Sequence, residues 1–218
     1  MKTLKNCVKN YIKNYVKNYI KDYIDESVWD IENNIEDDNK ESILNDIKKF
    51  IDDNYRGLNI DRCKFIFDEK KDKYVINCNQ PVILKISAKQ LTNGLFEWGK
   101  VKSLFDCSGS PITSLEGAPK HVDGGFDCSK CPKLESLEGA PEKVGATFDC
   151  RECDKLENLK GAPEYVGWSF RCSKCSKLES LEGASKEVGR YFDCSGCPNL
   201  HSLDGIGKVK GEIISDME

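Results

Sequence analysis

Hydrophobic residues in the second half of the chain recur in nearly the same order five times. In each repeat Phe is followed two positions later by Cys, and in the last four repeats then by a second Cys, two Leu and a Val. The phase is marked by Phe105, Phe126, Phe148, Phe170 and Phe192, and the spacing between them is nearly constant. A step of about 22 residues predicts a solenoid, in which each coil buries its apolar edge against its neighbours. We expect Phe, both Cys and both Leu to point inward.

Residues 1–60 have a helical pattern instead. A tetrad of the form Lys-Asn-Tyr-Ile repeats over residues 4–24, and its apolar residues follow the spacing of one helix face. Ser27 is expected to cap a second helix, a polar break is expected at residues 37–39, and the helical pattern resumes from Glu41 until Gly57 stops it. We therefore predict a helical hairpin that forms a cap over residues 1–60.

From Cys63 the period changes to two. Residues 63–67, 74–78 and 82–86 read as strands, and residues 91–99 as a degenerate first coil. The predicted fold class is α+β, with a β region and degenerate coil at 61–100 and a leucine-rich-repeat-like β-solenoid of 22-residue coils at 101–218. A cap is expected because an open solenoid end would expose apolar core and unpaired strand edges.

Charge and length exclude some classes of function. The net charge of -4 gives no general electrostatic case for nucleic acid, and no continuous apolar run is long enough to predict a membrane span. We read no signal peptide, so we expect a cytoplasmic protein with no nucleic-acid or membrane partner. Six lysines lie in residues 2–24, and residues 25–56 carry 11 acids against four bases. The basic helix either docks on its acidic neighbours or binds a membrane surface or a partner.

The cysteines offer a competing interpretation. Four Cys-x-x-Cys pairs follow one another at a constant spacing, which lies within the range of zinc sites. The pairs are Cys128/Cys131, Cys150/Cys153, Cys172/Cys175 and Cys194/Cys197. The same step also repeats Leu and Pro, and Ser110 replaces the second Cys of the first repeat, which a metal site would not tolerate. All twelve cysteines are expected to be reduced thiols, metal ligands or buried apolar residues. We favour buried thiols, without metal or cofactor; a zinc protein stays the alternative.

One family resemblance follows from these motifs. The segment Phe148-Asp149-Cys150-x-x-Cys153 and the later Leu159-Lys160-Gly161-Ala162-Pro163 resemble leucine-rich-repeat-like proteins of bacteriophages and gut bacteria. They are more distantly similar to the short repeats of bacterial effectors. The resemblance covers residues 91–209 and implies protein recognition on a concave strand face, without an established activity. It also suggests an alternative function, a phage-encoded inhibitor that blocks a host enzyme in the host cytoplasm.

Departures from the repeat indicate where a partner would bind. Trp, Tyr and Arg are enriched in interface hot spots, and three adjacent repeats place them where others have small or different polar residues. An outward row of acids runs beside them and is interrupted by Arg171, which could bridge Asp149 and Asp193. The candidate partner-binding residues are Trp168, Arg171, Tyr191, Arg190, Arg151, Asp149, Asp193 and Asp127. The alternatives are that Trp168 and Tyr191 pack over the coil edge and that the acidic row is simply solvated.

Catalysis has little support in the sequence. The only histidines, His121 and His201, lie in repeats far apart along the stack, and no Ser/His/Asp grouping or phosphate-cradling glycine loop occurs. We therefore expect a non-enzymatic, protein-binding scaffold.

Overall fold

The computed structural model describes residues 26–217, with side chains from Lys40 onward. The long helix α2 (Glu26–Asn54) is followed by the short 3-10 helix η2 (Ile60–Arg62) and by strands only. The chain divides into two compact units, and α2 crosses the boundary between residues 45 and 46. The basic helix predicted at residues 4–24 lies outside the described residues.

Helix α2 is uninterrupted, so the predicted break at residues 37–39 is wrong. Asp and Asn disfavour a helix interior by only about 0.7 kcal/mol each, and no Gly or Pro interrupts the hydrogen-bond ladder. The helix ends where the sequence predicted. Asn54 donates its side-chain amide to the Phe50 carbonyl at 2.9 Å, and Gly57 takes a left-handed φ of 57°.

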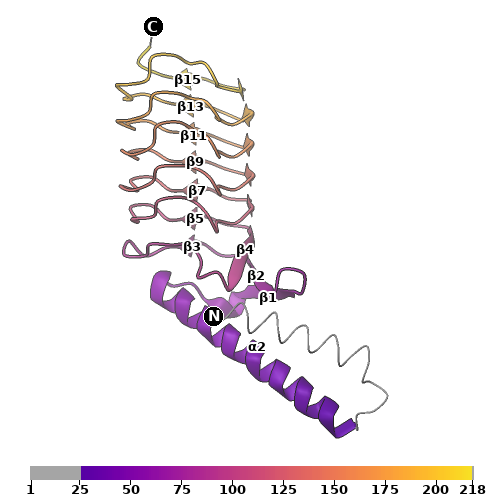
Figure 1. Ribbon diagram of the computed structural model, residues 1–218. Coiled ribbons are helices and arrows are strands. Elements are labelled where there is room, and N and C mark those ends of the chain that lie inside the picture. The colour runs from indigo at the N-terminus through magenta and orange to yellow at the C-terminus, as the bar shows by residue number, and fades with distance from the viewer. Residues whose placement is uncertain (1–25, 218) are drawn as a thin grey trace. The chain divides into compact units, whose positions relative to one another are not determined.

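Short strands of successive coils stack into two sheets (Figure 1). The eight-stranded sheet contains, in order, β1 (Cys63–Asp68), β2 (Lys73–Cys78), β4 (Phe96–Val101), β6 (His121–Val122), β8 (Lys143–Val144), β10 (Tyr165–Val166), β12 (Glu187–Val188) and β14 (Lys208–Val209). The seven-stranded sheet contains β3 (Val82–Ile83), β5 (Phe105–Asp106), β7 (Phe126–Asp127), β9 (Phe148–Asp149), β11 (Phe170–Arg171), β13 (Phe192–Asp193) and β15 (Ile213–Ile214). Within each sheet neighbouring strands are parallel, except that β1 and β2 form an antiparallel pair.

The predicted β-solenoid and its repeat length are thereby confirmed. Phe126, Phe148 and Phe170 occupy the same register position on adjacent strands. Strands β1 and β2 match the predicted pair, whereas β3 is shorter than the predicted 82–86. Each coil also holds a second strand that the pattern did not predict, ending at the repeated Val. The degenerate coil supplies β4, which joins β2 to β6.

The predicted inward residues form the core. Phe148, Cys150, Cys153, Leu156 and Leu159 are fully buried, as are their equivalents in most other coils. The stacked phenylalanine rings have centroids 5.3, 5.5, 5.2 and 4.9 Å apart from Phe105 to Phe192. Because Phe recurs at the same position of every coil, the rings form one continuous column, in which each ring contacts the ring of the next coil.

Aromatic residues close the core where the solenoid begins. The Trp98 indole N–H donates to the Tyr55 hydroxyl at 3.0 Å, and that hydroxyl donates to the Leu91 carbonyl at 2.5 Å. Phe50, near the end of α2, meets Phe96 edge to face at a centroid distance of 6.0 Å. The two hydrogen bonds satisfy the Trp98 N–H and the Tyr55 hydroxyl, which need partners because both rings are buried.

One disulfide corrects the expectation for the cysteines. Cys63 and Cys78 are bonded across β1 and β2, with Cα atoms 4.6 Å apart. The expectation of reduced thiols, metal ligands or buried apolar residues is therefore wrong for this pair. The antiparallel register places the two residues directly opposite each other, and closely spaced pairs of this kind suit a disulfide.

Candidate protein-binding surface

The repeated cysteines hold the coils together. The second Cys of each pair donates its thiol to the carbonyl of the first Cys in the preceding coil, at 3.2–3.3 Å for Cys131, Cys153, Cys175 and Cys197. Ser110 replaces the second Cys of the first repeat, and its hydroxyl donates within its own coil, to the Cys107 carbonyl at 2.5 Å, which also accepts from Cys131. Burial raises the pKa of the Cys175 thiol to about 12 and also raises the pKa of the Cys197 thiol. These two thiols therefore act as protonated hydrogen-bond donors inside the stack, whereas hydrogen bonds from its neighbours lower the pKa of Cys131.

The described residues give the zinc alternative no support. Among residues 40–217, no three His, Cys, Asp or Glu side chains are grouped so that they could hold a metal ion. A thiol that donates a proton to a carbonyl keeps that proton, whereas a zinc ligand must lose it.

The row of acids on the outer side of the seven-stranded sheet has a local structural role. The carboxylates of Asp106, Asp127, Asp149 and Asp193 each accept a hydrogen bond from the backbone N–H two positions later, at 2.9–3.2 Å. This contact fixes the turn that follows each strand. Burial raises the pKa of Asp127. The repeated Asp is thus explained by the turn, whether or not a partner also binds there.

Arg171 interrupts this row and organises its neighbours. Arg171 is in register with Asp149 on one side and Asp193 on the other. Its guanidinium lies 3.9 Å from the Asp149 carboxylate and donates to the Tyr191 hydroxyl at 2.5 Å. Arg151 donates its Nε to both oxygens of Asp149 at 2.9 and 3.0 Å. Asp149 is therefore covered by two arginines and is only 6% exposed.

Of the two ion pairs expected for Arg171, the structure shows the one with Asp149. Asp193 instead accepts two hydrogen bonds from Ser195, from its backbone N–H at 3.1 Å and from its hydroxyl at 2.7 Å. Arg171 also lies over the Tyr191 ring, with 5.5 Å between the guanidinium carbon and the ring centroid. Its hydrogen bond lowers the pKa of the Tyr191 hydroxyl.

Trp168 is the most exposed aromatic side chain next to this cluster. It lies between β10 and β11 and is 57% exposed. Arg190 occupies the equivalent position of the next coil, where its N–H donates to the Trp168 carbonyl at 2.6 Å, and its side chain is also exposed. Trp168 is thus the more exposed of the two aromatic residues, since Tyr191 is half-buried.

The structure thus gathers most of the predicted residues on adjacent coils. We define the Trp–Arg patch as Trp168, Arg190, Tyr191, Arg171 and Arg151. Asp149 lies beneath it, and Asp127 and Asp193 continue the acidic row on either side. The patch combines an exposed indole, an exposed guanidinium and two guanidiniums already oriented by Asp149.

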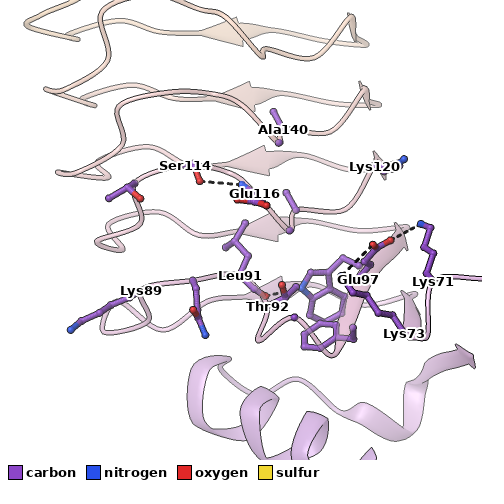
Figure 2. A pocket seen from close by; sticks show the side chains of 18 of the residues that line it. Lys71, Lys73, Lys89, Leu91, Thr92, Glu97, Ser114, Glu116, Lys120 and Ala140 are labelled. Carbon is purple, nitrogen blue, oxygen red and sulfur yellow. Dashed lines mark hydrogen bonds and ion pairs between the residues drawn. The ribbon is translucent and has the colours of Figure 1, made fainter. Parts of the chain in front are cut away.

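A groove of about 730 Å³ near the start of the solenoid was missed by the sequence interpretation (Figure 2). Its lining includes Lys89 and Lys120, and also Lys71 and Glu97, which form an ion pair with 2.7 Å between Nζ and Oε2. The degenerate coil lacks the Gly-Ala-Pro turn of the later coils, and this missing motif was the available signal. Mixed charge around the rim gives no clear preference for one class of ligand.

Comparison with protein-family models, curated proteins and solved structures finds no match. The resemblance to repeat proteins of bacteriophages and gut bacteria therefore stays a prediction that rests on the repeat motif alone. In the part of the chain that the structure describes, no helix combines the length and the apolar character needed to cross a membrane.

Proposed function

We propose that the protein is a non-enzymatic scaffold that binds another protein through the Trp–Arg patch. The observation that carries this proposal is the 57% exposure of Trp168 on a framework whose repeated positions are explained by stacking. Large aromatic side chains are costly to leave in water, and Trp, Tyr and Arg dominate the energetics of protein interfaces.

The framework around the patch is rigid, which favours tight recognition. Main-chain hydrogen bonds at 2.6–3.0 Å join each coil to the next at Trp168 and Arg190. Arg151 and Arg171 are held in place by Asp149 before any partner arrives. Side chains that are oriented in advance lose less conformational entropy on binding.

The proposal is tested by comparing captured proteins. Immobilised wild-type protein and the Trp168→Ala/Arg190→Ala variant are exposed to the same extract, and bound proteins are quantified by mass spectrometry. We expect a partner whose affinity falls at least 30-fold in the variant, since a hot-spot residue contributes about 2 kcal/mol or more. The control is Tyr165→Ala, an aromatic side chain of the other sheet that is 37% exposed.

Equal capture by wild type and by Trp168→Ala/Arg190→Ala would contradict the proposed patch. Equal loss in the Tyr165→Ala control would also contradict it, since the effect would then not be specific to the Trp–Arg patch.

A further inference from the structure

A second groove, smaller and more strongly charged, crosses the first strands of the eight-stranded sheet. It has a volume of about 330 Å³. Its lining residues are Arg62, Lys64, Ile66, Asn77, Asn79, Lys100 and Lys102. Four of the seven are basic and none is acidic, although the chain as a whole has a net charge of -4. We call this feature the basic groove.

Few internal partners neutralise these cations. Lys100 pairs with Asp123 at 2.9 Å. Within the described residues, the side chains of Arg62, Lys64 and Lys102 form no ion pair, and all three are exposed. Like charges repel one another across a shared groove, so a bound anion would stabilise the arrangement.

The uncharged polar groups also offer donors. The Asn77 side-chain oxygen accepts from the Lys100 backbone N–H at 2.6 Å, so its NH₂ group is the end that can serve a ligand. This contact sits where the register between β2 and β4 shifts. Gly99 leaves room for this amide, since a Cβ there would lie 2.4 Å from the same oxygen and would displace it. The sheet irregularity thus orients the amide.

We propose that the basic groove binds a small molecule that carries a polyphosphate, such as inorganic pyrophosphate or a nucleoside diphosphate. Guanidinium, ammonium and amide N–H groups are the donors that phosphate oxygens accept. The three cations that form no ion pair within the described residues match the multiple charges of a polyphosphate better than the single charge of a carboxylate. The volume falls in the range of small-molecule sites, and Ile66, which is 42% exposed, offers an apolar contact to the remainder of the ligand.

This site uses none of the residues of the Trp–Arg patch, so it goes beyond the proposed protein-binding function. The two proposals can fail separately. Capture of a protein partner tests the patch, and titration with a small anion tests the basic groove.

The experiment is calorimetric titration of the full chain with pyrophosphate and, separately, with ADP. We expect saturable binding that weakens as salt is raised. In Arg62→Ala/Lys64→Ala the affinity should fall at least 10-fold, because two of the three cations that form no ion pair in the described residues are lost. The matched control Lys155→Ala/Lys177→Ala removes two exposed lysines of the later coils and should bind as wild type. Thermal melting confirms that both variants fold.

Two probes distinguish other classes of ligand. An oligoglutamate peptide and a single-stranded RNA oligonucleotide are titrated under the same conditions. Tighter binding of either one than of pyrophosphate or ADP would overturn the assignment to a small polyphosphate. Absent pyrophosphate and ADP binding, or equal affinity in Arg62→Ala/Lys64→Ala, would overturn the site itself. Tighter binding of ADP than of pyrophosphate would support a contact between the nucleoside and Ile66.

Discussion

At the scale of single residues, one turn position explains an apparent irregularity of the repeat. In each of the five coils, the residue just before the second Cys position (Ser110 in the first coil) takes a left-handed φ of 56–69°. Gly109 and Gly196 occupy this position in two coils, and Lys130, Glu152 and Lys174 occupy it in the other three. In these three coils a charged residue therefore occupies a left-handed backbone conformation that Gly adopts without strain. Residues with a Cβ adopt it at an energetic disadvantage of about 1–2 kcal/mol.

This strain leads to a stability prediction. Lys174→Gly should raise the free energy of unfolding by about 0.5–1 kcal/mol, because relief of the strain exceeds the extra entropy of Gly in the unfolded chain. Urea denaturation provides the measurement. The control Lys177→Gly, three positions later and without a left-handed φ, should lower stability by about the same amount. Equal destabilisation by both substitutions would refute the argument from strain.

At the scale of the structural element, glycine has a second and different use. The corner between the two strands of a coil brings backbones so close that a side chain does not fit. A Cβ on Gly145, Gly167 or Gly189 would lie 1.9–2.1 Å from a carbonyl oxygen of the coil before. These glycines do not have a left-handed φ. Close approach of neighbouring coils is what requires them.

This close approach predicts that adding one methyl group at the corner lowers stability strongly. Gly167→Ala should lower the free energy of unfolding by about 2–3 kcal/mol, because rigid backbone must move to accept the Cβ. The control is Gly125→Ala, whose nearest contact would be the Thr147 carbonyl oxygen at 3.3 Å. That variant should lose less than about 1 kcal/mol, by comparison with small core changes. Chemical denaturation of both variants measures these changes. Equal losses of stability would show that close backbone approach at the corner is not the cause.

Sequence patterns predicted the elements that repeat and missed those that depend on spatial neighbours. The column of Phe148 and its equivalents followed from the period alone. Strands such as β8 have two residues, too few to show alternation, so the second sheet was not predicted. The Cys63–Cys78 disulfide depends on strand register. At the candidate site, Trp168 was recognisable as a departure from the repeat, whereas the burial of Asp149 depends on how two arginine side chains fold over it.

At the scale of the whole molecule, the buried thiols form a continuous internal column. Burial raises the pKa of Cys107, Cys128, Cys150 and Cys172 well above the ordinary value. Burial also raises the pKa of Cys194 to about 11. An unfolded thiol has a pKa of about 8.5, so the unfolded chain loses these protons at a lower pH than the folded chain does.

Stability should therefore fall in alkaline solution. A raised pKa in the folded state stabilises fully below the unfolded pKa, and this contribution is lost as the pH rises beyond it. Above about pH 9 each such thiol should lower the free energy of unfolding by about 1.4 kcal/mol per pH unit. Urea midpoints at pH 7.5 and pH 9.5 measure the change. Cys150→Ala/Cys172→Ala should show a shallower decline, and an unchanged decline would contradict the role of these thiols.

The column of phenylalanine rings also has a consequence for how the chain assembles. From Phe126 to Phe192, each ring contacts rings that lie one repeat away along the chain. Closing a loop of that length costs about 3 kcal/mol of entropy. Once one pair of coils has formed, every further coil docks on a finished template, so folding proceeds as a front that moves along the stack. Amide hydrogen exchange would then be graded. We expect it to be slowest around Phe148 and fastest at β15, where Ile213 is 41% exposed and β13 is the paired strand.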